Sequence, residues 1–115
     1  MSQRVPDKVQ YYPVGSLQLN EDESGARMWA VSLSKTMLTY FEVQSHCRFE
    51  NHHHESEQIT LVLEGELFFE ISGETFGVRA GEVIAIPSNM QHSVFTTDKA
   101  VKAVDAWSPI MQKYA

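Results

Sequence analysis

The sequence predicts an all-β fold, a small barrel or sandwich, and three observations support this prediction. Its 115 residues are 43% hydrophobic and 21% charged, as expected of one globular domain with a core of its own. Short apolar runs alternate with turn-forming pairs at near-regular intervals from residue 28 onward. No segment repeats its apolar residues with the period of an amphipathic helix. These features are typical of about eight short strands in a barrel or sandwich.

The chain divides into an N-terminal arm, residues 1–26, and a single barrel domain, residues 27–115. The arm is polar and is broken by two prolines and a glycine. We expect one short strand over residues 14–19, followed by an acidic, turn-rich loop over residues 20–25.

The strands of the barrel are expected between turn signals such as Ser72-Gly73. They cover residues 28–34, 37–43, 58–63, 67–71, 75–78, 83–86, 93–97 and 101–107. Two-residue alternation places Leu67 and Phe69 on one strand face and Phe68 on the other.

Charge and cysteine content exclude several classes of partner. The formal net charge is −6 and no run of Lys and Arg occurs, so neither nucleic acid nor a membrane is an expected partner. Cys47 is the single cysteine, which leaves no intramolecular disulfide and fits a reducing compartment. No signal peptide and no apolar run of roughly 20 residues is visible. We therefore expect a cytoplasmic protein.

Two segments supply the side chains of one metal site. Residues i and i+2 of an extended strand point the same way, so His52 and His54 can face one side while His53 faces away. Gln58 begins the next strand, and His92 begins a later strand after a proline-containing turn. Three imidazoles and one amide oxygen suit a single divalent transition metal such as Zn, Ni, Fe, Mn or Co.

Other readings of these residues remain open. A lone His-x-His pair is most often a pair of surface histidines on a strand. Glu57 replaces Gln58 as the oxygen ligand if the bend before it is one residue tighter. His46 and His53 are interpreted as surface residues or neighbours of the ligands, and Cys47 as a buried cysteine rather than a thiolate ligand.

The neutral residue at position 58 indicates the chemistry. Three neutral histidines and Gln58 leave the ion its full positive charge, whereas a carboxylate would reduce that charge. Such an ion favours Lewis-acid chemistry on a carbonyl, carboxylate or water over oxygen activation.

These two segments resemble the two motifs of the cupin family. The positions that match the first motif are His52, His54, Gln58 and Gly65, and those that match the second are Gly81, Pro87 and His92. Asn89 stands where the family has a Gly, Thr96 where it has an Asn, and His46 where the first motif begins with Gly. Asn tolerates the left-handed turn that the Gly serves. The resemblance implies a small single-domain, RmlC-like jelly roll (a double-stranded β-helix barrel) with ligands His52, His54, Gln58 and His92.

Gln58 and residues 59–66 are most similar to the pectin-degradation cupins, which convert unsaturated uronates to their linear form. Their C-terminal Asp-x-Phe-Ser-Pro-x-Arg segment corresponds to residues 105–111, but Met111 replaces the Arg that would hold a substrate carboxylate. Arg27, together with Arg48 and Arg79, is a candidate to replace that Arg. Tyr40 is a further candidate for substrate binding.

Asp105 is the candidate catalytic residue. It shares one face of the last expected strand with Ala103 and Trp107, and a carboxylate on an apolar stripe is costly unless it is paired or used. Facing a metal cavity, it would serve as general acid or base. The alternative is an Asp at a strand edge bonded to backbone N–H groups. Trp107 is either a platform for a sugar ring or a core residue.

The sequence therefore favours a metal-dependent enzyme of carbohydrate metabolism that opens, tautomerises or isomerises a small sugar or sugar acid. The alternatives are a non-catalytic metal-dependent binder or sensor, and a cupin dioxygenase. The resemblance also implies a homodimer, with the strand over residues 28–34 and the N-terminal arm as exchange elements.

Overall fold

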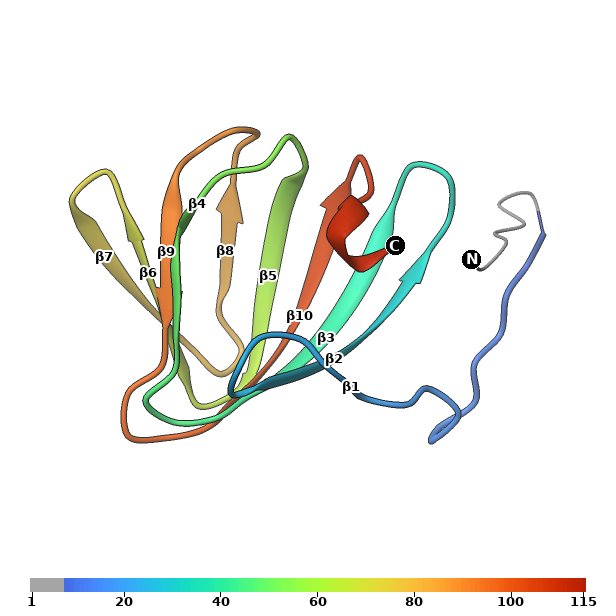
Figure 1. Cartoon of the computed structure of the whole chain (residues 1–115), viewed down its shortest axis with the longest axis horizontal. Coiled ribbons are helices and arrows are strands. Elements are labelled where there is room, and N and C mark those ends of the chain that lie inside the picture. The colour runs from blue at the N-terminus through green and yellow to red at the C-terminus, as the bar shows by residue number, and fades with distance from the viewer. Residues whose placement is uncertain (1–7) are drawn as a thin grey trace.

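The computed structural model describes residues 8–115 and shows two antiparallel β-sheets that face each other (Figure 1). The larger sheet contains, in order, β1 (Asn20–Glu21), β2 (Ala26–Ser32), β3 (Met37–Val43), β10 (Val101–Ser108), β5 (Glu57–Glu64) and β8 (Val83–Ile86). The smaller sheet contains β4 (Arg48–His52), β9 (His92–Phe95), β6 (Glu66–Ile71) and β7 (Glu74–Arg79). A short 3-10 helix, η1 (Gln112–Tyr114), follows β10. This is the all-β jelly roll expected from the sequence.

The hydrophobic core lies between the sheets, and β3, β5 and β10 alternate residues buried in it with more exposed ones. In β3, Met37, Thr39, Phe41 and Val43 are buried, and the residues between them are more exposed. The buried core cluster consists of Ala26, Met28, Phe41, Val43, Cys47, Val62, Leu67, Phe69, Val78, Ile86, Val94, Val101 and Ala103. Both sheets contribute to it, so core packing holds them together.

The eight strands expected in the barrel all form, with ends shifted by at most two residues. The prediction of a strand over residues 14–19 is wrong. Pro13 accepts a hydrogen bond from the backbone of Ser16 (3.0 Å), and Gly15 has a φ of 83°, so the chain turns there. Along the described chain, strand pairing begins at β1, which forms a hairpin with β2 in which Asn20 lies opposite Met28.

Among the described residues, two strands were not predicted: β1, which lies where an acidic loop was expected, and β4. β4 is rich in polar residues and exposed along much of its length, so it carries no apolar alternation. It forms because it pairs with β9, more than forty residues later in the sequence, with Phe49 opposite Val94 and His52 opposite His92. The pairing has an irregularity between Phe49 and His52, which sets the direction of the chain just before the histidine segment.

The three positions that depart from the cupin motifs have structural explanations. His46 and Asn89 both adopt the left-handed conformation, with φ of 54° and 62°, as the glycines of the motifs would. The expectation that Asn serves in this turn is thus confirmed. The Thr96 hydroxyl accepts a hydrogen bond from the Cys47 amide (3.0 Å) and donates one to the Gln44 carbonyl (2.6 Å). Thr96 therefore ties the end of β9 to the loop before β4.

The part of the arm that the structure describes, residues 8–19, extends beyond the barrel (Figure 1). The Gln10 side chain donates a hydrogen bond to the Ser32 carbonyl at 3.4 Å. Residues 1–7 of the predicted arm lie outside the described residues, and the boundary at residue 27 stays a prediction. Within residues 8–115, no helix has the length and apolar character that crossing a membrane requires.

Candidate metal centre

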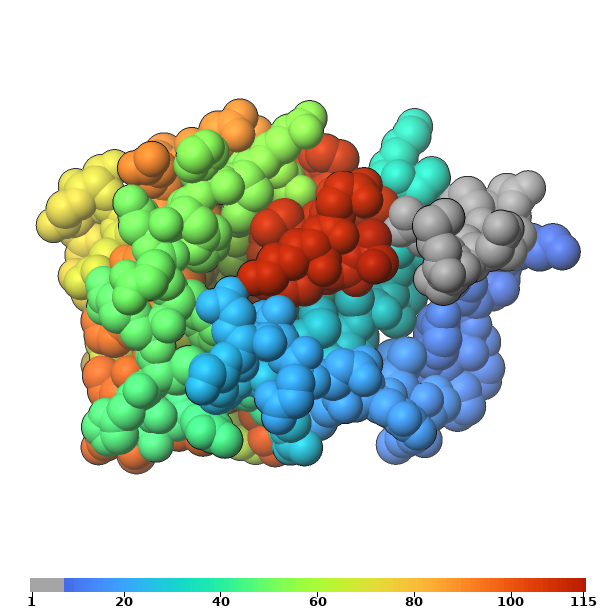
Figure 2. All heavy atoms as spheres, viewed as in Figure 1, coloured from blue at the N-terminus to red at the C-terminus, as the bar shows by residue number. Residues whose placement is uncertain are grey.

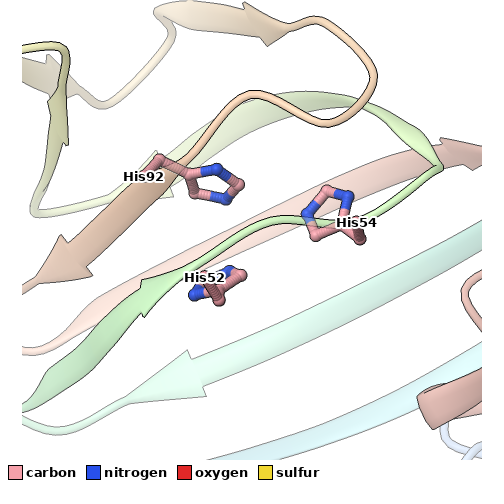
Figure 3. Close-up of side chains that lie close together, drawn as sticks. All are labelled: His52, His54 and His92. Atoms are coloured by element: carbon pink, nitrogen blue, oxygen red, sulfur yellow. The ribbon is translucent and has the colours of Figure 1, made fainter.

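The rings of three histidines, two on strands and one in a loop, lie close together (Figure 3). His52 ends β4 and His92 begins β9, where the strand pairing sets them opposite each other. His54 follows in the loop after β4, and the Asn89 amide donates a hydrogen bond to its carbonyl at 2.7 Å. The two motif segments are thus bonded to each other directly. One nitrogen of each ring lies within 4.8 Å of the corresponding nitrogen of the other two.

Backbone carbonyls determine which ring nitrogen each histidine presents. Nδ1 of His52, His54 and His92 lies 2.7, 2.8 and 2.8 Å from the backbone oxygens of Glu50, Ser56 and Met90, respectively. A carbonyl oxygen only accepts hydrogen bonds, so each Nδ1 carries the proton and each Nε2 keeps a free lone pair. Nε2 of His54 and of His92 is buried with no hydrogen-bond partner within residues 8–115. Three lone pairs therefore face one point, as in metal-binding histidines.

Gln58 is the candidate for a fourth ligand. It lies in β5, is buried, and lines the same cavity as His52 and His92. Its Nε2 donates to the Thr60 hydroxyl at 3.0 Å, which leaves Oε1 buried without a partner in the described part of the chain. Glu57, the alternative oxygen ligand, lies on the exposed face of β5. The donor set fits one divalent transition metal, with three Nε2 atoms and one amide oxygen.

The environment of His92 keeps its ring neutral. Burial, together with smaller contributions from the neighbouring His52 and His54, lowers the pKa of His92 to about 4. The hydrogen bond to the Met90 carbonyl acts in the opposite direction but does not outweigh burial. A neutral imidazole is the form that binds a metal ion.

Asp105 lies behind Gln58 in a buried polar network. The register of the larger sheet puts it between Thr39 on β3 and Thr60 on β5. Its Oδ2 accepts a hydrogen bond from Thr39 (3.1 Å), and its Oδ1 accepts one from Thr60 and one from Gln58 Nε2 (3.5 Å). Burial raises the pKa of Asp105 to about 6, although the hydrogen bonds from Thr60, Thr39 and Gln58 lower it.

The two readings of Asp105 can now be compared with its surroundings. It lies in β10, a central strand between β3 and β5, and its hydrogen-bond partners are side chains rather than backbone N–H groups. It also lines the cavity. These surroundings favour the interpretation of Asp105 as a residue that faces the cavity over its interpretation as a residue at a strand edge. Because it accepts a hydrogen bond from the Gln58 amide nitrogen, Asp105 helps to fix the orientation of the Gln58 side chain.

A cavity of about 370 Å³ opens beside the histidines. Its lining includes Phe41, Val43, Phe49, Leu67, Phe69, Val94, Ala103, Trp107, Met111 and Tyr114, together with Asp22, Glu23, Glu50, Asn51, His52, His53, Gln58, His92, Asp105 and Lys113. Trp107 is in this wall, and its indole N–H donates to the Thr39 hydroxyl at 2.8 Å. The Trp107 ring lies edge-on to the His54 ring, with centroids 5.3 Å apart. Trp107 is thus both packed in the core and exposed to the cavity.

The C-terminal segment supplies cavity residues that the sequence did not indicate. Tyr114 packs edge-on against Phe41 (5.5 Å between centroids) and lies 5.7 Å from Trp107. Lys113 forms an ion pair with Glu23 at 2.7 Å, which joins the segment to the β1–β2 loop. Figure 2 shows this segment, in red, on the front of the molecule beside that loop, in blue. An aromatic residue in a short C-terminal tail was the one local signal.

The structure does not bring the other candidate substrate-binding residues to the cavity. Arg27 and Tyr40 lie on the outer face of the larger sheet, where both bond to Glu42 (2.9 and 2.8 Å). Arg48 pairs with Glu70 at 2.5 Å on the smaller sheet, and Arg79 pairs with Glu66 at 3.7 Å. Along the described chain, no arginine lines the cavity, and Met111 lines it in place of the Arg of the pectin-degradation cupins.

The remaining histidines and the cysteine lie apart from the ligand cluster. His46 is exposed at its turn, and His53 is exposed at the cavity mouth. Cys47 is buried, its thiol donates to the Ser24 carbonyl at 3.3 Å, and burial raises its pKa. This fits the reading of Cys47 as a core residue.

Comparison with known proteins places this geometry in a family. The cupin domain model matches residues 39–107, more than half of the chain. KdgF from Halomonas sp. superposes with a TM-score of 0.86 at 18% identity, over 94% of this chain and 100% of that chain. An RmlC-like cupin from Shewanella frigidimarina also gives 0.86, at 15% identity over 96% and 100%. The polyketide cyclase RemF from Streptomyces resistomycificus gives 0.69, at 24% identity over 96% and 81%.

One curated relative is similar at the level of sequence. The polyketide synthase CurC from Streptomyces cyaneus is 35% identical over 65 residues, which are 56% of this chain and 42% of that protein. The chain thus matches less than half the length of this relative. The solved structures show the shared fold, and the domain model shows the family. The chain belongs to the cupin family, as the two histidine motifs indicated.

Proposed function

We propose that this cupin is a metal-dependent enzyme that uses Lewis-acid chemistry on a small carbonyl compound. The observation that carries the proposal is the Gln58 oxygen, which is buried and without a hydrogen-bond partner in the described residues, beside three histidines with free Nε2 atoms. All four donors are neutral. A divalent ion bound by them would keep its charge and polarise a carbonyl oxygen.

The chain's own residues hold the ligands and provide a proton-transfer group. Backbone carbonyls orient the histidine rings, and Thr60 and Asp105 orient the Gln58 amide. Asp105 is the proposed general acid or base, because it lines the cavity and its raised pKa of about 6 is near neutral pH. Ring opening, tautomerisation and isomerisation all require such a proton transfer next to a carbonyl.

Sugar acids are the first substrate class to test. Their support is the similarity of Gln58 and residues 59–66 to the pectin-degradation cupins, together with the shared fold of KdgF. Metal-loaded protein is mixed with an unsaturated uronate, and the loss of the enol ether absorbance is followed. Turnover that requires the metal and is lost in His92→Ala would support this class. No acceleration over buffer, with metal bound, would remove it.

A second substrate class has its own support. Polyketide-like carbonyl compounds fit the largely apolar buried wall of the cavity, and RemF and CurC are named for polyketide chemistry. The proposed reaction type is similar for both classes, since each requires a proton to be moved to or from a carbon atom next to a carbonyl group. Turnover without oxygen would distinguish both from a dioxygenase, and tight binding without product would indicate a binder or sensor.

We also propose that the protein acts in the cytoplasm as a homodimer. The supports are a single, buried cysteine and an outer sheet face with exposed apolar side chains, among them Leu38, Ile59 and Val83.

A further inference from the structure

We propose that the cavity takes a neutral, mainly apolar substrate with an aromatic or flat unsaturated group next to a pair of carbonyl oxygens. The inference rests on the proposed function, because the carbonyl oxygens are those that the metal would bind. It chooses between the two substrate classes above by the chemistry of the cavity walls.

The buried wall of the cavity is apolar apart from the metal end. Every buried lining residue except three is hydrophobic: Phe41, Val43, Leu67, Phe69, Val94, Ala103 and Trp107. The three exceptions are Gln58, His92 and Asp105. A hydrophobic wall of this extent favours burial of an apolar group and provides no partners for hydroxyl groups.

The three buried polar residues already have other partners or a proposed role as metal ligands. Gln58 and His92 are the proposed ligands, and both oxygens of Asp105 accept hydrogen bonds from Thr39, Thr60 and Gln58. A sugar acid presents several hydroxyls, each of which loses its hydrogen bonds to water on entering the cavity. Beyond the metal and Asp105, the buried wall offers nothing to replace those bonds.

The cavity mouth disfavours an anion. Asp22, Glu23 and Glu50 line it, against one lysine, Lys113. The Lys113 ammonium already pairs with Glu23 at 2.7 Å. To pair with Lys113, a substrate carboxylate would have to displace Glu23, and away from the metal it would face two further acidic groups, whereas a neutral compound meets neither cost.

Aromatic side chains give the cavity the shape for a flat group. Phe49 and Trp107 line it, and Tyr114 lies across it in edge contact with Phe41. The volume of about 370 Å³ is enough for a ligand of more than one ring. Aromatic walls favour stacked or edge-on contacts with an unsaturated ligand.

Three probes test the inference on the protein loaded with the metal it retains on purification. Acetylacetone carries the carbonyl pair alone, benzoylacetone adds a phenyl ring to the same pair, and an unsaturated uronate carries hydroxyls and a carboxylate. Affinities are measured by titration calorimetry, with metal content determined afterwards. We expect benzoylacetone to bind at least about tenfold more tightly than acetylacetone, because its ring is buried. We expect the uronate to bind more weakly than benzoylacetone.

Matched variants show where the phenyl ring of benzoylacetone binds. Phe49→Ala and Tyr114→Ala each remove an aromatic side chain from the cavity and should reduce the phenyl gain, which is the ratio of the benzoylacetone affinity to the acetylacetone affinity. Phe68→Ala is the control, because Phe68 does not line the cavity and stacks on Phe95 (5.1 Å between centroids). It should leave the gain intact.

The outcomes separate this inference from the proposed function. A uronate that binds more tightly than benzoylacetone, no phenyl gain, or a full gain in both cavity variants would overturn the inference and leave the metal chemistry standing. A protein that takes up no metal contradicts the proposed function instead. The phenyl gain on that metal-free protein still decides the substrate class: its presence supports the inference and its absence overturns it.

Discussion

The two faces of the larger sheet use the same strands for opposite purposes. On the inner face, Thr39, Asp105 and Thr60 lie side by side across β3, β10 and β5 and bond to one another in a buried network. On the outer face, Leu38, Ala106 and Ile59 occupy the next positions of the same three strands. Because successive residues of a strand point to opposite faces, a polar network beside the proposed metal site and an exposed apolar row lie on the two faces of the same strands.

The difference between the two faces shows where polar interactions contribute most to the stability of the fold. Inner-face groups are cut off from water, so each unpaired donor or acceptor there is costly. The outer-face pair of Arg27 and Glu42 remains in contact with solvent, with side chains 56% and 27% exposed, so its ion pair contributes little. Replacing polar residues of the inner face should therefore have large effects, and replacing polar residues of the outer face small ones.

Removing an inner ligand should have the largest effect. His92→Ala deletes a buried Nε2 that points at the histidine cluster, so we expect metal affinity to fall by more than about a hundredfold. The measurement is metal content together with competition against a chelator. His53→Ala, an exposed neighbour, is the matched control and should retain the metal. Full metal occupancy in His92→Ala would show that the cluster is not the metal site.

A charge in the outer apolar row should break the predicted homodimer. Ile59 is 51% exposed, and Ile59→Lys would place an unpaired ammonium in the contact. We expect dimer affinity to fall by about a hundredfold or more, measured by light scattering over a concentration series. Phe76→Lys on β7 of the smaller sheet is the control and should remain dimeric. A monomeric unmodified protein would contradict the prediction.

Disrupting the network of Thr39, Asp105 and Thr60 should have an intermediate effect on stability and on metal affinity. Thr60→Val removes the donor to Asp105 and the acceptor for Gln58, so the free energy of unfolding should drop by about 1–3 kcal/mol. Metal affinity should also fall, by about tenfold, because the Gln58 amide loses its orientation. Chemical denaturation and metal competition measure the two effects. Thr60→Ser keeps the hydroxyl, and a loss in Thr60→Ser equal to that in Thr60→Val would mean that the methyl group, and not the hydroxyl, matters.

The smallest effect is expected on the outer face. Arg27→Ala removes the exposed ion pair with Glu42, and the free energy of unfolding should change by less than about 1 kcal/mol. Added salt should reduce even that difference, because it screens exposed charges. Metal and benzoylacetone affinities should be unchanged. A loss of ligand binding in this variant would return Arg27 to the substrate site, as the sequence first suggested.

Local signals explain why most of the fold could be predicted. The strands of the barrel have apolar alternation and turn residues in their own sequence, and Asn89 adopts the left-handed turn that its residue type allows. The four proposed ligands were found in the same way, because strand parity and motif spacing are both properties of neighbouring residues. β4 carries no such signal, and only its distant partner β9 makes it a strand.

The sequence by itself determined the family, the order of the barrel strands along the chain and the residues that can meet at a metal. Each of these depends on residue type and on spacing along the chain. Tertiary structure alone decided what surrounds that point. It turned Arg27 and Tyr40 outward, joined Asp105 to Gln58 through Thr60, and brought Tyr114 and Lys113 to the cavity. The reason is that contacts between segments far apart in sequence follow from how the sheets pack, and no local pattern encodes them.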